Sequence, residues 1–152
     1  MYNQIQYIFL LTALHLTASP VLGAQVNALR EEATMNFATI IANPFGDNIT
    51  LTPSGSISGQ NSSIFTGTPQ PAEFSVQGDS NTSASISFGT GDTLSGPGSS
   101  MSLINFTHDA GASPAFNNTG NLFFNVGATL TINAGQFGGS YSGFYTVTVD
   151  YP

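Results

Sequence analysis

The sequence predicts an all-β fold, a sandwich or a barrel, on three observations. Short runs rich in Phe, Ile, Val, Thr and Tyr alternate with Gly, Ser, Pro and Asn about every ten residues. Several runs alternate apolar and polar residues with the period of two that a half-buried strand requires. The sequence shows neither an alternation of strands with helices nor a repeat of solenoid length. A length of 152 residues fits one such domain.

Charge and cysteine content exclude several classes of function. Lys and Arg together number 1, Asp and Glu number 8, and the net charge is −7. A nucleic-acid surface or a polybasic membrane surface needs a basic stripe, so both classes are excluded. The absence of cysteine excludes disulfides, thiolate metal sites and cysteine nucleophiles. A hydrophobic content of 40%, with 12 Phe and 5 Tyr, is sufficient for a packed core.

The first element in chain order is expected to be a secretory signal peptide at residues 1–23. An apolar stretch begins at Ile8-Phe9-Leu10-Leu11, and Ser19-Pro20 and small residues up to Ala24 follow it. This order is typical of an exported protein, although the usual basic residues are missing from positions 1–4. The alternative is a buried N-terminal helix.

Residues 24–33 are expected to form an N-terminal extension, and residues 34–152 the β-sandwich domain. The extension is the only stretch with good helix formers, and it holds Arg30, the single basic residue. Arg30, Glu31 and Glu32 are expected to be a solvated face.

Eight strands are expected after the extension. Phe74 and Val76 share one face of their strand, as do Leu130 and Ile132, because successive side chains point to opposite faces. Residues 54–71 have the lowest complexity and are expected to form a long surface loop. The expected strands are at 35–41, 48–52, 73–77, 84–88, 101–107, 122–125, 128–133 and 141–151.

Candidate catalytic and metal-binding groups are few, and each has a simpler structural interpretation. His108 precedes Asp109, but a triad also needs a nucleophile in contact with both, and the pair is more simply the turn that ends a strand. Asp79 and Asp92 stand at turns and lack the dense Asp-x-Asp pattern of a calcium loop. We therefore expect no enzymatic activity, no cofactor and no metal.

The strand at 141–151 has the longest clean alternation in the chain. Natural sheets protect exposed edges with charge, especially Lys, and this chain has no Lys, which indicates that its strand edges are paired by something else. One face of the strand carries Tyr141, Gly143, Tyr145, Val147, Val149 and Tyr151, and the other carries Ser142, Phe144, Thr146, Thr148 and Asp150.

This strand resembles the C-terminal signature strand of chaperone–usher pilus subunits. Those strands combine alternating apolar residues with a penultimate tyrosine and a glycine at the fourteenth position from the end; Tyr151 and Gly139 occupy these places, counted from Pro152. The resemblance implies an immunoglobulin-like antiparallel β-sandwich, either complete in itself or lacking its final strand. A sandwich that lacks its final strand has a groove beside the C-terminal strand. The resemblance implies that a periplasmic chaperone first fills this groove by strand addition. The N-terminal extension of a neighbouring subunit, delivered at an outer-membrane usher, then takes the chaperone's place.

The region after the signal peptide also resembles a bacterial secreted family, domain-of-unknown-function family 4402. Three segments carry the resemblance: Phe37-Ala38-Thr39-Ile40, Val126-Gly127-Ala128-Thr129-Leu130, and the ending from Gly139 to Tyr151. The family's pattern has Gly at the place of Ala38. The resemblance covers residues 36–151 and implies fold and export rather than an activity.

The expected function is that of a structural subunit of a bacterial cell-surface fibre, pilus- or fimbria-like, assembled by β-strand complementation. Its partners would be other copies or related fibre subunits, and it would pass through the periplasm to the cell surface. The assembly strand would use Gly139, Tyr141, Gly143, Tyr145, Val147, Val149 and Tyr151.

The donor extension would offer Val26 and Ala28 in one register and Leu29 in the other. Because Arg30-Glu31-Glu32 interrupts both registers, the subunit would use another register, cap a fibre or fold as a complete sandwich. The alternative function is a secreted carbohydrate-binding or adhesive sandwich that does not polymerise, with a loop aromatic such as Phe116 in contact with the ligand.

Overall fold

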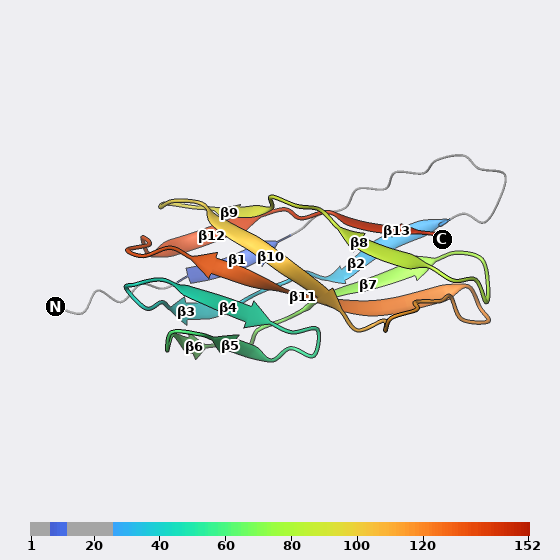
Figure 1. The fold of residues 1–152 in the computed structure, drawn as a ribbon, viewed down its shortest axis with the longest axis horizontal. Coiled ribbons are helices and arrows are strands. Elements are labelled where there is room, and N and C mark those ends of the chain that lie inside the picture. Colours follow the sequence, from blue (N-terminus) through green and yellow to red (C-terminus); the bar gives the residue numbers. More distant parts are fainter. Residues whose placement is uncertain (1–6, 12–25) are drawn as a thin grey trace.

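The computed structural model describes residues 7–11 and 26–152, and the regular secondary structure of these residues is entirely β (Figure 1). Within these ranges no helix is long and apolar enough to cross a membrane. In chain order the strands are β1 (Tyr7–Leu11), β2 (Ala28–Ala33), β3 (Thr39–Ile41), β4 (Asp47–Leu51), β5 (Ile57–Gly59), β6 (Ile64–Thr66), β7 (Ala72–Gln77), β8 (Ser85–Phe88), β9 (Thr93–Ser95), β10 (Met101–His108), β11 (Asn121–Ile132), β12 (Gly139–Gly143) and β13 (Val147–Asp150).

The strands form a sandwich in which the long strand β11 pairs with three other strands, β10, β7 and β4. One edge of β11 pairs with β10, and the other edge pairs first with β7 and then with β4. β7 is followed by β2, β4 by β5, and β10 by β9 and then β12. The two-stranded sheets β13–β8 and β3–β6 are also antiparallel. The predicted all-β antiparallel sandwich is therefore confirmed.

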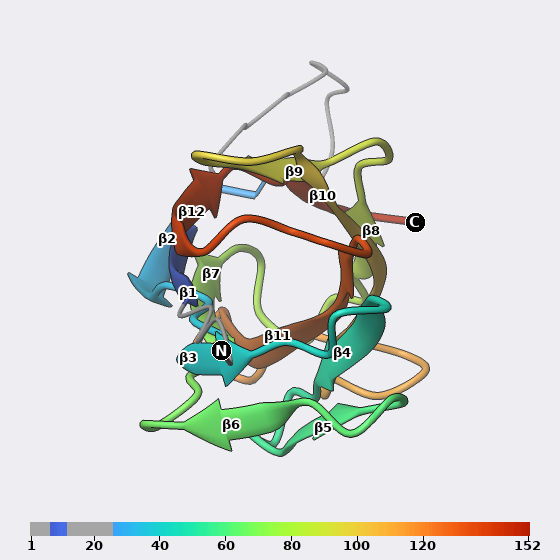
Figure 2. The same cartoon turned by 90° about the vertical axis from the view of Figure 1, so that its left-hand side faces the viewer.

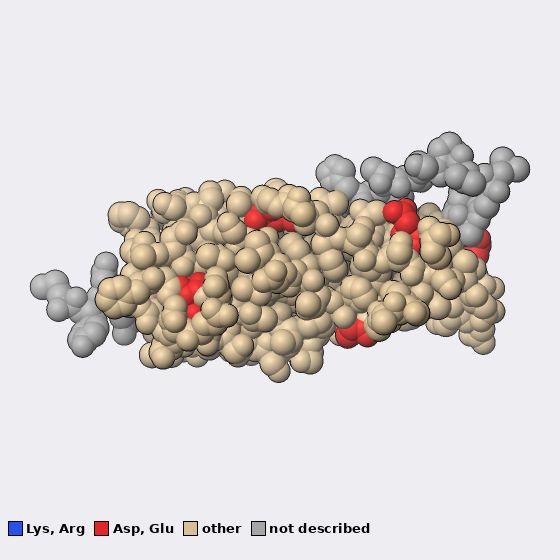
Figure 3. Space-filling model, in the orientation of Figure 1, with Lys and Arg blue, Asp and Glu red and all other residues tan. Residues whose placement is uncertain are grey.

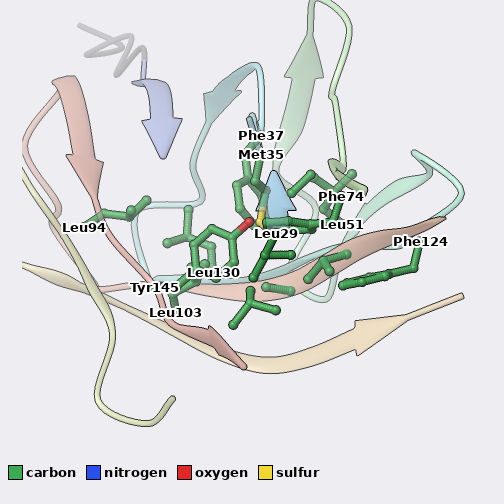
Figure 4. Packing of buried hydrophobic residues seen from close by; sticks show 14 of the residues in the cluster. Leu29, Met35, Phe37, Leu51, Phe74, Leu94, Leu103, Phe124, Leu130 and Tyr145 are labelled. Atoms are coloured by element: carbon green, nitrogen blue, oxygen red, sulfur yellow. The ribbon is translucent and has the colours of Figure 1, made fainter. Parts of the chain in front are cut away.

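The core is built from alternate residues of these strands, which surround it when the molecule is viewed along its length (Figure 2). Leu29, Phe74, Phe124 and Tyr145 converge there from β2, β7, β11 and the C-terminal region (Figure 4). The rings of Phe74 and Phe124 stack with centroids 5.3 Å apart, and Tyr145 meets Phe74 edge-on at 6.4 Å. Each fully buried side chain of this kind contributes roughly 1.5–3 kcal/mol to folding.

The expected strand boundaries differ from the structure in three main places, of which two lie before residue 134. The strands expected at 122–125 and 128–133 are one continuous strand, β11, which passes through Gly127. A Cβ at Gly127 would overlap the carbonyl oxygen of Leu51, so only glycine lets β4 approach here. The loop expected at 54–71 contains β5 and β6, because this segment pairs with β4 and β3.

The strand expected at 141–151 is interrupted at residues 144–146. Gly143 pairs with Leu94 and Val147 pairs with Phe88, so residues 144–146 lie opposite the longer segment 89–93. The excess residues on the β8–β9 side break the ladder locally, as in a β-bulge. Burial still alternates through the break, since Tyr145 is 1% exposed and Phe144 is 70% exposed.

Candidate assembly edge

Tyr141 fixes the first half of the C-terminal strand in the core. Its side chain is fully buried, and its hydroxyl accepts hydrogen bonds from the Gly98 N–H at 2.9 Å and from Nε2 of Gln136 at 2.8 Å. The same hydroxyl donates to the carbonyl of Phe137 at 2.8 Å. A Cβ at Gly96 would lie 2.5 Å from Cδ1 of the Tyr141 ring, so a glycine is required at this position. The buried hydroxyl is therefore fully satisfied.

Tyr145 connects the C-terminal region to β2. Its hydroxyl lies 3.5 Å from Oε1 of Glu31, and its ring stacks on Phe106 with centroids 5.3 Å apart. Burial, together with the charge of Glu31 and the hydrogen bond to it, raises the pKa of Tyr145 above its usual range. Tyr145 therefore stays neutral and donates to the carboxylate.

Tyr151 holds the end of the strand against the turn that follows β7. Its hydroxyl accepts a hydrogen bond from the Asp79 N–H at 2.6 Å, and its ring lies 5.5 Å from that of Phe116. A Cβ at Gly78 would overlap the Tyr151 hydroxyl, so this turn also needs glycine. Three tyrosines thus anchor the strand at its start, middle and end.

The outer edge of β12 is paired by the N-terminal strand β1. β12 pairs with β9 at one edge, antiparallel, and with β1 at the other, parallel. The register runs without a shift from Tyr7 opposite Gly139 to Leu11 opposite Gly143. Figure 2 shows β1 between β12 and β3. The outer edge of β12 is therefore covered by a strand from the N-terminal region.

The second half of the C-terminal strand has one strand neighbour among the described residues. β13 pairs with β8, and β2 likewise pairs with β7 alone. We call the outer edges of β12 and β13, on the side away from β9 and β8, the acceptor edge. Its residues are those predicted as the assembly strand, and their predicted alternation is present: Tyr141, Tyr145, Val147 and Val149 are buried, and Tyr151 is half-buried.

A comparison with protein-family models identifies the chain. The model of a domain of unknown function, DUF4402, matches residues 28–151. The chain belongs to this family. No curated protein matches the chain. The DUF4402 domain begins at the first residue of β2 and includes β13, while β1 lies outside it.

The segment predicted as a donor extension is paired within the DUF4402 domain. Ala28 to Ala33 form β2, which is antiparallel to β7. Leu29 is a core residue with 6% of its surface exposed. Val26, which precedes β2 in the chain, is partly buried and packs against the core. Burial of Leu29 and the ladder with β7 outweigh the helix propensity of this sequence.

The structure does not combine His108 and Asp109 into an acid–base pair. The Asp109 carboxylate accepts hydrogen bonds from the N–H and the side-chain amide of Asn125, at 2.7 Å and 3.0 Å. The His108 ring lies between Phe88 and Phe124, with centroids 6.1 Å and 6.2 Å away. In the described ranges no group of three or more acidic or His side chains could hold a metal ion.

Phe116, named as a loop aromatic that could contact a sugar, is instead a core residue. It is 2% exposed and packs on Tyr151. The prediction that this side chain is available at the surface is therefore wrong. The exposed aromatic side chains of the described residues are Phe45, Phe123, Phe137 and Phe144.

Sequence reasoning missed the residues that hold the acceptor edge in place. Gly96, Gly98 and Gln136 surround Tyr141, and Glu31 meets Tyr145 from the other end of the DUF4402 domain. These residues belong to turns or to a charged run, and nothing in the local pattern marks them. Only the tertiary pairing of the strands brings them to the tyrosines.

The carboxylate of Asp47 organises the segment that contains β5 and β6. It accepts hydrogen bonds from the N–H groups of Gln60 and Asn61, at 2.8 Å and 2.9 Å, and from the hydroxyl of Ser63 at 2.6 Å. Burial alone would raise the pKa of Asp47, but the Ser63 hydroxyl and the backbone N–H groups outweigh it and hold the pKa below its usual value. Asp47 is therefore a structural carboxylate.

Replacing Asp47 by Asn is expected to destabilise the protein by about 1.5–3 kcal/mol at pH 7, because charge-assisted hydrogen bonds are lost. A lowered pKa in the folded state stabilises the fold above the unfolded-state pKa, near 4, and this contribution disappears as the pH falls through the folded-state pKa. Urea unfolding at pH 7 and below pH 3 measures both effects. Asp79→Asn, at an exposed carboxylate, is the control; equal losses in the two variants would contradict the assignment.

Replacing Asp92 by Asn is expected to raise the melting temperature at pH 7. Oδ2 of Asp92 is buried without a hydrogen-bond partner in the described part of the chain, and this desolvation raises its pKa. The folded protein favours the neutral form of the Asp92 carboxyl group. The wild type therefore loses stability as the pH rises through the raised pKa, whereas the Asp92→Asn variant has no charge to bury and does not. Thermal unfolding at pH 3 and pH 7 tests this. A gain as large at pH 3, or a similar gain from the exposed Asp150→Asn, would contradict it.

Proposed function

We propose that this protein is a structural subunit of a bacterial cell-surface fibre and assembles by β-strand complementation. The observation that carries the proposal is the acceptor edge. At β12 this edge is paired by a strand that lies outside the DUF4402 domain, and at β13 it has no strand neighbour in the described residues. An added strand at this edge would complete the C-terminal side of the domain.

The cost of leaving this edge open supports the proposal. The sequence predicts that residues 1–23, which include β1, are removed as a signal peptide. Removal would leave the backbone N–H and C=O groups of β12 that face β1 without their ladder partners. An open edge beside buried Tyr141 favours capture of another strand by backbone hydrogen bonds.

The charge distribution also supports association with similar chains. β12 (GSYSG) carries no charged residue and β13 (VTVD) carries only Asp150. On the face shown in Figure 3, acidic side chains form separate small patches on a largely uncharged surface. Like-charge repulsion between copies at this edge is therefore weak, and no Lys blocks it. We propose other copies or related subunits as fibre partners, with a periplasmic chaperone and an outer-membrane usher acting before assembly.

The proposal is tested with residues 24–152, purified alone and mixed with a synthetic ten-residue strand of alternating apolar residues. At a peptide concentration of about 100 times its Kd, mass action adds about 2.7 kcal/mol to the free energy of unfolding. We expect a rise of about 5–10 °C in melting temperature, measured by circular dichroism. The same peptide with two central prolines is the control. A stable monomer that gains nothing from the first peptide would contradict strand complementation.

The alternative, a carbohydrate-binding or adhesive module that does not polymerise, has less support. Sugar-binding platforms use exposed aromatic faces, and Phe116, Tyr141 and Tyr145 are buried. Specific binding on a glycan array that is lost in Phe45→Ala or Phe137→Ala would favour this alternative.

A further inference from the structure

We propose that Tyr7–Leu11 closes the β12 part of the acceptor edge of its own chain until the predicted signal peptide is removed. Removal would then switch the subunit from a self-complemented form to an assembly-competent form. This inference rests on the proposed function, since it concerns the regulation of the same edge. It adds that the precursor carries its own temporary complementing strand.

The pairing of β1 is the first support. All five residues of β1 pair with all five residues of β12, in one register and without a bulge. The pairing is parallel, whereas the other strand pairs of the described residues are antiparallel. β1 also lies beside β3, so it bridges the C-terminal strand and the start of the domain (Figure 2). β1 therefore fills a place between two elements of the DUF4402 domain.

The position of β1 in the sequence is the second support. The family match begins at residue 28, so the DUF4402 domain contains no strand of its own for this place. The occupant comes from the apolar stretch that the sequence predicts to be the core of the signal peptide. The same cleavage that releases the signal peptide would therefore empty the edge.

The covalent link makes this occupant hard to displace. A strand that belongs to the same chain as its partner strand competes at an effective concentration that can reach the millimolar range. A free partner strand at micromolar concentration would need an intrinsic affinity roughly a thousandfold higher to compete equally. Strand addition at β12 is therefore disfavoured before cleavage, and this protection ends when β1 is removed.

Three proteins test the inference: the full chain 1–152, residues 24–152, and the full chain with Ile8→Pro and Phe9→Pro. Successive N–H groups of a strand point to opposite sides, so one of the two prolines removes a donor directed at β12. The matched control is the full chain with Thr17→Pro and Ala18→Pro, outside β1. The measurements are hydrogen exchange of the β12 amides and binding of a fluorescent peptide of residues 5–14 with a solubilising lysine tail.

We expect the full chain and the control variant to bind the peptide at least 100-fold more weakly than residues 24–152, with slower exchange in β12. The double-proline variant should behave like residues 24–152, and unchanged exchange in β11 verifies that the domain is folded. Equal peptide binding by the full chain and residues 24–152 would overturn this inference and leave the proposed function intact. Retained protection of β12 in the double-proline variant would also overturn it. If residues 24–152 bind no peptide and protect β12 unaided, the proposed function fails as well.

Discussion

Replacing Tyr141 by Phe will destabilise the protein by about 2–4 kcal/mol, although the change removes a single oxygen atom. The Tyr141 hydroxyl satisfies the Gly98 N–H, the Gln136 amide and the Phe137 carbonyl. Tyr141 and Gln136 are both buried, so solvent cannot replace the hydrogen bond between them without local rearrangement. Each buried polar group left without a partner costs about 1–3 kcal/mol. Chemical denaturation of the full chain measures the loss.

Tyr151→Phe is the matched control for this prediction. The Tyr151 hydroxyl accepts a hydrogen bond from the Asp79 N–H, and Asp79 is exposed, so water can replace this bond. We expect a loss of about 1 kcal/mol or less. If the two variants lost similar amounts of unfolding free energy, burial of the Tyr141 hydrogen bonds would not explain their contribution to stability. The Tyr141→Phe variant should also show faster hydrogen exchange in β12.

Replacing Gly127 by Ala will destabilise the protein by more than about 3 kcal/mol or prevent its folding. A Cβ at this position would overlap the Leu51 carbonyl oxygen and lie 2.7 Å from the Thr52 carbonyl carbon and 2.9 Å from the Pro53 nitrogen. All three atoms belong to the backbone, so relief of the clash would require separating β11 from β4. Soluble yield and the midpoint of guanidinium unfolding measure the effect.

Gly111→Ala separates this steric effect from the general cost of replacing glycine. Gly111 has a φ of 80°, and a Cβ there would meet no atom within 4 Å. The expected cost is about 1–2 kcal/mol, from the left-handed backbone conformation alone. If Gly127→Ala cost no more than Gly111→Ala, close packing of β4 against β11 would not be the reason for Gly127.

The C-terminal strand shows what the sequence could predict. Its alternation gave the correct buried face because side-chain period depends only on local backbone geometry, and Tyr141 and Val149 obey it on either side of the break. The break itself was not predictable, because it arises from the excess residues at 89–93 in the opposite strand. Local pattern therefore determines which residues face the core, but the partner strand determines where the ladder is continuous.

Other elements could not be predicted because their cause lies far away in the sequence. Residues 28–33 have helix-forming side chains, yet they form β2 because β7 offers a ladder and the core takes Leu29. Residues 57–66 are mostly polar and of low complexity, yet they form β5 and β6 next to the Asp47 carboxylate. The sequence of the expected signal peptide does not indicate that Tyr7–Leu11 pairs with β12, because these two strands are some 130 residues apart in the chain.

The length of β11 has a consequence for a protein placed under tension. Because β11 is bonded to β10 along one edge and to β7 and β4 along the other, it joins both halves of the sandwich in one continuous strand. Pulling these halves apart along the strand direction would load many ladder bonds at once, and they would have to fail together rather than one after another. This shear geometry resists force best along the long axis of the molecule, the direction in which β11 runs (Figure 1).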